Sequence, residues 1–460
     1  MNDLTLTSNR IMLTATGSGA GKTTITCGLL KALINRHKSV VSFKCGPDYI
    51  DPMFHSKIIG TKSRNLDIFM CGEDNVKYLL AKNSVGCDIS VIEGVMGMYD
   101  GLLFQSDYAS SNHLSKLTDT PQILIVNVKG MSLSVVALIK GFLCYKENNI
   151  KGVILNNCTQ GMYSIYKKMI EDELSVHVYG YFPNVKEASI ESRHLGLVTA
   201  NEISDINKKL DLLAKTAEEC LDIDAILSLA SSAKALQYKA IEPSMTKKLN
   251  VKIAVARDNA FCFTYEDNID LLKKLGAEIE YFSPLNDTTL PNNMDGLILC
   301  GGYPEEYAQE LSKNKAMLQC IKNAIENKMP TIAECGGFMY LMDSITDKNN
   351  ISYPMVSAIK GNSYMTSKLS RFGYINLTAK VDNLLCKKGE SINAHEFHYS
   401  NSDNNGDDFQ ASKRSKEWDC IHATDTLFAG YPHIHFWGNT NFAVNFIQKC
   451  DAYKQSKESL

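Results

Sequence analysis

A glycine-rich loop that ends in lysine and threonine lies near the start of the chain, after an apolar stretch and before a helix-like pattern. Glycines let backbone N–H groups approach phosphate oxygens, and a helix N-terminus favours their negative charge. We expect Lys22 to reach the β- and γ-phosphates of a nucleoside triphosphate and Thr23 to ligate Mg²⁺. The predicted nucleotide-binding residues are Gly17, Gly19, Gly21, Lys22, Thr23 and Thr24.

Carboxylates follow two further strand patterns. One pattern leads to Asp48 and Asp51, and a buried-strand pattern later in the chain ends at Glu93. Because parallel strands bring their carboxyl ends to one ligand crevice, these side chains should face the phosphates. Glu93 can hold Mg²⁺ opposite Thr23. The glycine loop after it carries Asp100 over the crevice, where a plain turn residue is the alternative.

A second chemical centre is a cysteine between a strand pattern and a pair of glycines. Cys335 at such an elbow lies at a helix N-terminus, whose dipole lowers the pKa of a thiol, and the glycines admit a substrate. A thiolate nucleophile needs a histidine from elsewhere in the chain. Strand alternation puts His433 and His435 on one face, so one could be the base and the other its orienter. Cys300 is the nearest rival, and the glycine turn after it can stabilise an oxyanion.

A third polar cluster runs from His395 to Ser400 and contains His398. Histidines at this spacing are compatible with a metal site. A loop that contacts a ligand is equally compatible with the same residues, so the sequence leaves both readings open.

Strand-like and helix-like segments alternate through both halves of the chain, which is the pattern of doubly wound α/β sheets. Near residue 236 the chain becomes more polar before a second α/β unit opens. The predicted parts are an ATP-binding domain at 1–235, a linker at 236–250, a second α/β domain at 251–450 and a polar tail at 451–460.

Composition excludes several classes of function. The 48 basic and 51 acidic residues leave no net field that would attract nucleic acid. No apolar run of membrane-spanning length and no signal peptide is visible, so we expect a cytoplasmic protein without a membrane partner. The 14 cysteines contain no C-x2-C pair, which argues against zinc.

Along nearly its whole length the chain resembles the cobyrinate a,c-diamide synthases of vitamin B12 biosynthesis. The matching segments are Lys22 to Thr24, Gly46 to His55, Glu93 to Gly97, Gly302 to Glu305, Glu334 to Gly337 and His395 to Ser400. The resemblance implies an N-terminal doubly wound P-loop domain like dethiobiotin synthetase. It also implies a C-terminal α/β domain like the class I glutamine amidotransferases.

In that scheme Cys335 attacks the amide of glutamine, His433 is its base, and N–H groups near Gly302 and Gly336 bind the oxyanion. Ammonia then amidates the a and c carboxylates of cobyrinate, which MgATP has activated as acyl phosphates. Mg²⁺ would be held by Thr23, Asp48 and Glu93. The implied substrate residues are Tyr49, Asp51, Asp100, His395 and His398. Many glutamine amidotransferases have His-x-Glu where this chain has His433-Ile434-His435, so the third triad position is altered.

Alternatives remain at this point. The same chemistry could act on hydrogenobyrinate or nickel sirohydrochlorin, because motifs that bind carboxylates do not reveal the metal of the macrocycle. A protein of another class would be a nucleotide-dependent switch ATPase with a degenerate amidase domain, although intact Cys335 and His433 argue against it. Cobyrinate and glutamine are the expected small-molecule substrates, and a homo-oligomer stays open.

Overall fold

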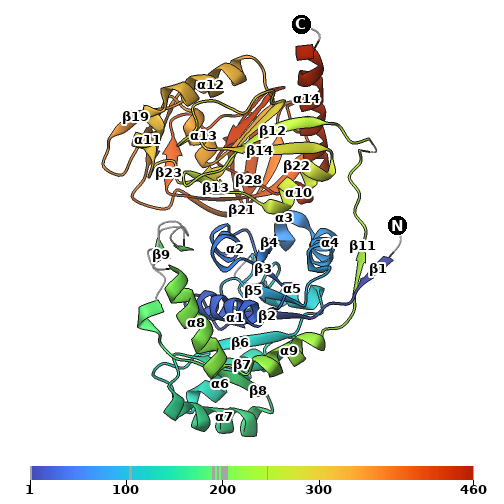
Figure 1. Cartoon of the computed structure of the whole chain (residues 1–460), viewed down its shortest axis with the longest axis vertical. Helices are drawn as coiled ribbons and strands as arrows, with labels where there is room; N and C mark the ends of the chain where they lie inside the picture. The colour runs from blue at the N-terminus through green and yellow to red at the C-terminus, as the bar shows by residue number, and fades with distance from the viewer. Residues whose placement is uncertain are drawn as a thin grey trace. The chain divides into compact units, whose positions relative to one another are not determined.

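A computed structural model describes residues 3–102, 106–188, 192–193, 196–197, 206–245 and 247–458 (Figure 1). The chain divides into two compact units. The first comprises Met1–Ile68 and Gly72–Ile241, and the second comprises Phe69–Cys71 and Glu242–Leu460. No helix in the described ranges combines the length and the apolar character that crossing a bilayer requires.

The first unit is built on a seven-stranded sheet whose neighbouring strands are all parallel, in the order β4-β3-β5-β2-β6-β7-β8. Along β6, Ile123 and Ile125 pack into one apolar core, whereas Leu124 and Val126 pack into another. Both faces of the sheet are therefore buried, which explains the continuous apolar runs of its strands. The predicted doubly wound α/β fold is confirmed. The strands are β2 (Arg10–Ala15), β3 (Val40–Cys45), β4 (Lys62–Leu66), β5 (Ile89–Glu93), β6 (Gln122–Asn127), β7 (Ile150–Asn156) and β8 (His177–Phe182).

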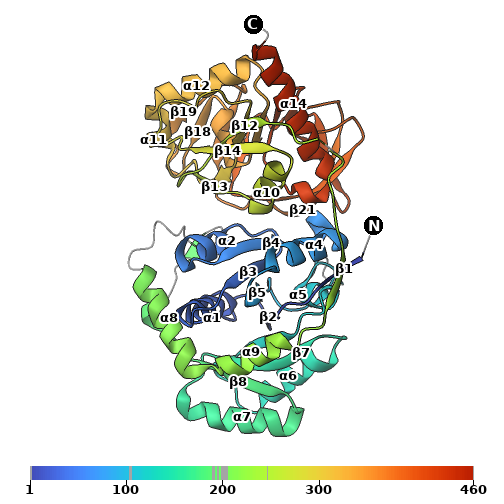
Figure 2. The ribbon, with the colours of Figure 1, turned by 45° about the vertical axis from the view of Figure 1, so that its right-hand side comes forward.

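Helices cover both faces of this sheet (Figure 2). The core that contains Ile123 is closed by α1 (Lys22–Asn35), α8 (Ile206–Cys220) and α9 (Ile223–Ser231). The other core is closed by α6 (Ser134–Cys144) and α7 (Gln160–Leu174). Further helices of this half of the chain are α2 (Ile50–Phe54), α3 (Ile68–Cys71), α4 (Glu73–Ser84) and α5 (Ser111–Leu117), and a π-helical turn spans His55–Ile59.

The two ends of the first unit meet in a small antiparallel sheet. β1 (Asp3–Leu6) pairs with β11 (Leu236–Lys239) in register, residue by residue. Leu236 and its partner Leu6 are both buried. The segment predicted as a linker at 236–250 therefore begins as a strand of the first unit.

A six-stranded sheet in the order β14-β12-β15-β17-β27-β26 forms the centre of the second unit. Its pairs are parallel except for the edge pair of β26 and β27. The α/β fold predicted for this unit is thus confirmed. The strands are β12 (Val251–Ala256), β14 (Ala277–Phe282), β15 (Gly296–Leu299), β17 (Thr331–Glu334), β26 (His422–Ala423) and β27 (Leu427–Gly430), and the helices are α10 (Glu266–Lys274), α11 (Ala308–Lys313), α12 (Lys315–Glu326), α13 (Gly336–Leu341) and α14 (Thr440–Glu458).

Smaller sheets, antiparallel or mixed, complete the second unit. One has the order β25-β24-β21-β22-β28, with β21 (Arg371–Ala379), β22 (Ser391–His398), β24 (Phe409–Lys413), β25 (Lys416–Cys420) and β28 (His433–Ile434). A second has the order β19-β18-β20-β23, with β18 (Ser344–Thr346), β19 (Ser352–Pro354), β20 (Asn362–Met365) and β23 (Ser400–Ser402). A third pairs β13 (Phe261–Phe263) with β16 (Gly301–Gly302). Phe69 counts with this unit, and its carbonyl accepts a hydrogen bond from Asn393 Nδ2 at 2.7 Å.

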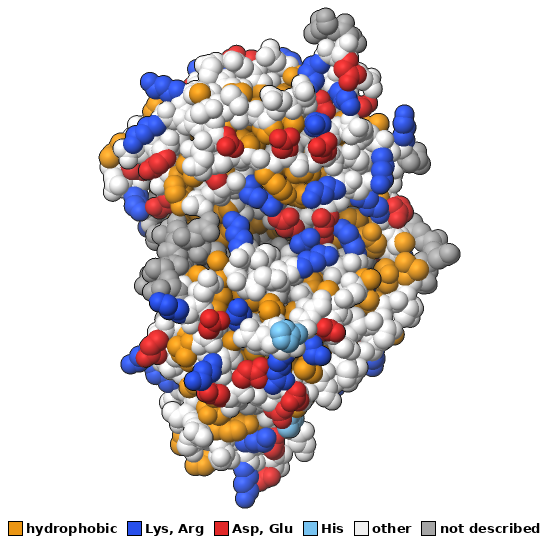
Figure 3. Space-filling view, in the orientation of Figure 1, with side chains coloured by type: hydrophobic (Ala, Val, Ile, Leu, Met, Phe, Trp, Pro, Cys, Tyr) orange, Lys and Arg blue, Asp and Glu red, His pale blue; other side chains and the backbone are white. Residues whose placement is uncertain are grey.

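The predicted polar tail is largely helical. Residues 451–458 continue α14, and residues 459–460 lie outside the described residues. Lys457 holds this end of the helix in place, because its Nζ donates to Met294 O at 2.7 Å and pairs with Asp295 Oδ1 at 2.9 Å. On the face drawn in Figure 3, basic and acidic side chains are interspersed, in keeping with the nearly balanced charge of the sequence.

Candidate functional site

The glycine loop adopts a conformation that side chains would obstruct. Gly21 has φ of +99°, and a Cβ built there would lie 2.1 Å from Asn156 Nδ2. Gly19 also has a positive φ, of +73°, whereas Gly17 lies in open space. Lys22 then begins α1, and its Nζ donates to the carbonyl oxygens of Met96 and of Gly17, the latter at 3.3 Å.

Lys22 is buried, and its pKa is lowered to about 8. Burial is the largest cause and the nearby Lys44 ammonium adds to it, while Glu93, Asp51 and Asp100 act in the opposite direction. An anion placed at this ammonium would offset its desolvation. The electrostatics of the loop therefore favour a phosphate group.

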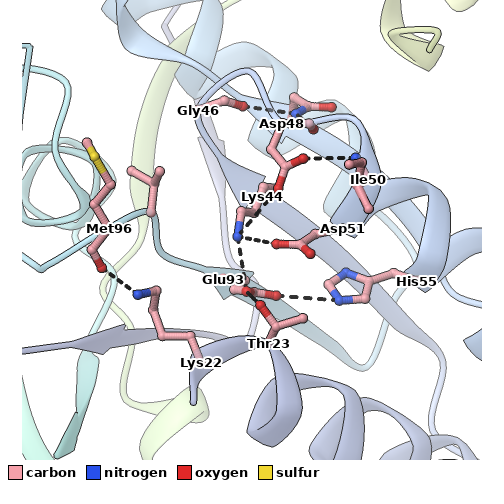
Figure 4. A network of polar contacts seen from close by, with 12 residues as sticks. Lys22, Thr23, Lys44, Gly46, Asp48, Ile50, Asp51, His55, Glu93 and Met96 are labelled. Carbon is pink, nitrogen blue, oxygen red and sulfur yellow. Dashed lines mark hydrogen bonds and ion pairs between the residues drawn. The ribbon is translucent and has the colours of Figure 1, made fainter. Parts of the chain in front are cut away.

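The loop and the end of β5 are joined directly, as Figure 4 shows. Thr23 Oγ1 donates to Glu93 Oε1 at 2.7 Å. Thr24, the next residue of α1, is half-buried. The predicted pair of Thr23 and Glu93 is thus brought together by the parallel pairing of β2 with β5.

Lys44 is a residue that sequence reasoning missed, and it is the centre of the carboxylate cluster (Figure 4). Its Nζ lies 3.0 Å from Glu93 Oε1 and 3.9 Å from Asp48 Oδ2, and it forms a short ion pair with Asp51 Oδ2. Lys44 is only 5% exposed. The signal that could have revealed it is a lysine inside a buried strand, since such a charge is rarely buried unless it is paired.

The pKa values of the cluster depend on this ammonium. For Asp51, burial raises the pKa, but Lys44 and His55 together lower it to about 2. For Glu93, burial and the charge of Asp51 outweigh Lys44 and raise the pKa to about 7. His55, also missed from the sequence, lies with Nε2 3.5 Å from Glu93 Oε2, and burial lowers its pKa to about 4. His55 is therefore neutral at pH 7.

The donor set suits a hard divalent cation. Thr23, Asp48 and Glu93 supply only oxygen atoms, which Mg²⁺ prefers. Glu93 Oε2 is buried and has no hydrogen-bond partner among the described residues. Those residues contain no ready-made cluster of three or more histidine, cysteine or acidic ligands. The oxygen donors of Thr23, Asp48 and Glu93 fit a cation that also takes ligands from phosphate or water.

Two further predicted substrate residues lie around this cluster. Asp100 is exposed, and its Oδ2 accepts a hydrogen bond from the Gly97 N–H at 2.8 Å, so it supports the turn that it belongs to. It also acts electrostatically on Lys22. Tyr49 directly precedes α2, the short helix that carries Asp51. Asp100 thus lies in the loop that follows Glu93, and Tyr49 lies next to the helix that carries Asp51.

In the second unit, Cys335 occupies a strained elbow between β17 and α13. Its φ is +47° and ψ is −102°, a conformation that non-glycine residues rarely adopt. Its N–H donates to Gly430 O at 2.7 Å, which anchors the turn to β27. A Cβ built on Gly336 would lie 3.0 Å from Gly302 N, so the two predicted oxyanion-binding glycines are brought side by side.

His433 lies beside the nucleophile elbow. Its ring hydrogen-bonds Cys335, and a Cβ built on Gly301 would lie 2.6 Å from its Cε1. Burial lowers the pKa of His433, but its interactions with Cys335 and then Glu334 outweigh burial and raise the pKa to about 10. His433 Nδ1 is 3.5 Å from Glu334 Oε2. Cysteine, histidine and carboxylate therefore form one buried constellation.

The alternation predicted for His435 does not extend that far. β28 ends at Ile434, and His435 instead caps a 3₁₀ turn at Phe436–Gly438. Its Nδ1 accepts the Trp437 N–H at 3.3 Å, and its ring centroid is 4.8 Å from that of Tyr265. The residue that contacts the ring of His433, as a residue that orients the base would, is Glu334 rather than His435.

The rival cysteine and the third polar cluster also belong to this unit. Cys300 is buried, its Sγ donates to Ala256 O at 3.2 Å, and burial raises its pKa to about 12, which suits packing rather than nucleophilic attack. His395 pairs in register with His433 across β22 and β28. His398 stacks on Tyr431 with ring centroids 4.0 Å apart, and its Nδ1 lies 2.8 Å from Ser400 O. His395 thus lies beside His433 in the sheet, and His398 interacts with His433 electrostatically.

Two family models match the chain. The CobQ/CobB/MinD/ParA nucleotide binding domain matches residues 11–198, and the CobB/CobQ-like glutamine amidotransferase domain matches residues 252–441. Among solved structures, PurLQS from Thermotoga maritima is 15% identical and covers 45% of this chain and 99% of its own, with a TM-score of 0.32. MinD from Aquifex aeolicus is 16% identical and covers 48% of this chain and 95% of its own, with a TM-score of 0.30.

Curated relatives are similar along the whole chain. A cobyrinate a,c-diamide synthase from Caldanaerobacter subterraneus subsp. tengcongensis is 40% identical over 96% of this chain and 98% of its own. A cobyrinate a,c-diamide synthase from Clostridium acetobutylicum is 41% identical over 95% of this chain and 99% of its own. One from Priestia megaterium is 38% identical over 98% of this chain and 99% of its own.

Proposed function

The chain belongs to the cobyrinate a,c-diamide synthase family, and on that premise we propose that it is the ligase that amidates the a and c carboxylates of cobyrinate with nitrogen from glutamine, in cobalamin biosynthesis. The observation that carries the proposal is the near end-to-end identity of 38–41% with synthases of this name. The reaction has two halves. The phosphate loop and carboxylates of the first unit serve activation of the acceptor, and the cysteine–histidine pair of the second unit serves glutamine hydrolysis.

Glutamine hydrolysis is the task of the second unit. Cys335 attacks the side-chain amide carbon as a thiolate, after its thiol proton has passed to His433. N–H groups of Gly302 and Gly336 stabilise the oxyanion that forms on the amide oxygen. His433 returns the proton to the leaving nitrogen, ammonia departs, and water cleaves the thioester to release glutamate.

Activation of the acceptor is the task of the first unit, because a carboxylate resists ammonia until it carries a leaving group. A carboxylate oxygen of cobyrinate attacks the γ-phosphorus of ATP, which yields an acyl phosphate and ADP, and ammonia then displaces phosphate. Lys22 neutralises charge on the transferring phosphoryl group, and Asp51 and Asp100 organise the substrate. Thr23, Asp48 and Glu93 would hold Mg²⁺, which supplies charge neutralisation at the phosphates when bound.

The test is mass spectrometry of the products formed from MgATP, glutamine and cobyrinate by the purified protein. The expected product carries two new amides. Hydrogenobyrinate and nickel sirohydrochlorin are each also offered in direct competition with cobyrinate, and the turnover of the rings is compared. Unchanged cobyrinate together with faster turnover of either other ring would overturn the acceptor that we assign. Hydrolysis of ATP and glutamine with no amidated ring at all would overturn the ligase assignment as well.

A further inference from the structure

We propose that Glu334, the residue directly before the nucleophile, is the carboxylate that positions His433 for glutamine hydrolysis. Many glutamine amidotransferases carry this carboxylate two residues after the histidine, where this chain has His435. The inference rests on the proposed function and deepens it, since it assigns the third group of the cysteine centre.

Both carboxylate oxygens of Glu334 are directed at the strand that carries the base. Oε2 lies 3.5 Å from His433 Nδ1, and Oε1 accepts the Ile434 N–H at 3.2 Å. The backbone hydrogen bond fixes the carboxylate relative to β28, so the imidazole meets an oriented partner.

The elbow explains how adjacent residues reach the same imidazole. Successive side chains of a strand point to opposite faces, so an extended chain would direct residues 334 and 335 apart. The positive φ of Cys335 breaks that alternation, and the pairing of Glu334 with Gly430 holds the end of β17 in place. The thiol and the carboxylate can therefore both approach one ring.

The two contacts divide the ring nitrogens of His433 between two tasks. A proton kept on Nδ1 by Glu334 leaves Nε2 to accept the thiol proton, as in other triads of nucleophile, histidine and carboxylate. When Nε2 is protonated, the carboxylate stabilises the imidazolium. The side chain of Glu334 is 13% exposed and that of His433 is 3% exposed, so little water screens this attraction.

Other titratable groups around His433 do not offer the same partner. His395, Glu396 and His398 interact with it electrostatically from β22. Burial lowers the pKa of His395 to about 3 and that of His398 to about 4, so both are neutral at pH 7. Burial raises the pKa of Glu396 to about 7. Glu334 thus provides the charge that contacts the imidazole directly.

The test is Glu334→Gln, which keeps the length of the side chain and removes its charge. We expect glutamine-supported kcat to fall by roughly 10²-fold with little change in KM for glutamine, while amidation from added ammonia persists. Alkylation of Cys335 by iodoacetamide, followed on its own peptide by mass spectrometry, should shift its pH midpoint upward by about one unit, because the thiolate–imidazolium pair loses its stabilising charge.

Controls separate positioning from folding. Glu334→Asp restores a carboxylate and should recover part of kcat and of the alkylation profile. Glu326→Gln, an exposed change in α12, should leave kcat and the alkylation midpoint at parent values. Ammonia-supported turnover and an unchanged melting curve establish that Glu334→Gln is folded. Parent kcat and a parent alkylation midpoint in Glu334→Gln would overturn the proposal. If the parent fails to amidate cobyrinate from ammonia, the acceptor assignment fails, while glutaminase and alkylation still decide the role of Glu334.

Discussion

Lys44→Met should destabilise the first unit selectively. The substitution keeps an unbranched apolar stem and leaves Asp51 and Glu93 buried without the ammonium that both contact. Removing one partner from a buried charge network costs about 3–5 kcal/mol. The pKa of Asp51 is about 2 rather than its ordinary 3.8, which accounts for about 2 kcal/mol of that figure. For a unit of this size, 3 kcal/mol corresponds to a fall in Tm of roughly 6–12 °C.

The distribution of tryptophan allows the two units to be followed separately. Trp418 and Trp437 both belong to the second unit, so their fluorescence should report an unchanged transition. Hydrogen exchange of peptides from β3 and β5 reports the first unit, and their opening free energy should fall by about 3 kcal/mol or more. Lys31→Met is the matched control, because Lys31 pairs with the exposed Asp211 at 3.8 Å and should cost less than about 1 kcal/mol.

The effect of Lys44 also has a defined pH dependence. Folding lowers the pKa of Asp51, so the stability that this group contributes is complete above about pH 4 and is lost as the pH falls towards 2. The difference between parent and Lys44→Met should therefore narrow on acidification through that window. Equal exchange protection of β3 and β5 in both proteins at pH 7 would refute the reasoning, because it would mean that the carboxylates tolerate burial without the lysine.

Three further predictions concern the separate sites. Lys22→Ala should abolish amidation with either nitrogen source, whereas Cys335→Ala should abolish only the glutamine-supported reaction, as measured by product mass spectrometry. Loss of the ammonia-supported reaction in folded Cys335→Ala would contradict the assignment of acceptor activation and glutamine hydrolysis to separate units. Gly21→Ala should remove ATP binding in equilibrium dialysis, because φ is +99° and the added Cβ would meet Asn156, and retained affinity would exclude that geometry. Cys300→Ser should keep the parent glutaminase rate, because Sγ only donates to a carbonyl, and an inactive, folded variant would make Cys300 the nucleophile candidate.

Local sequence was sufficient for much of the architecture. Apolar runs buried on both faces predicted the parallel sheet, and each glycine-rich junction between a strand and a helix lies where the pattern indicated, at Gly21–Lys22 and at Cys335–Gly336. These features are encoded within a few residues, because glycine conformation and apolar periodicity act over one turn or one strand. The antiparallel sheet built on β21 and β22 was not predicted, since its pairing depends on residues distant in the chain.

The partners inside each site were decided only by the tertiary structure. Lys44 meets Glu93 because β3 and β5 pair in parallel, and Glu334 meets His433 across about a hundred positions of sequence. His435 lies away from that contact because β28 ends after two residues, a boundary that alternation alone does not reveal. By itself, the sequence determined which residue types could react and on which kinds of turn they lie. Which charges neutralise one another was determined by strand order and register, because buried ion pairs form between neighbours in space.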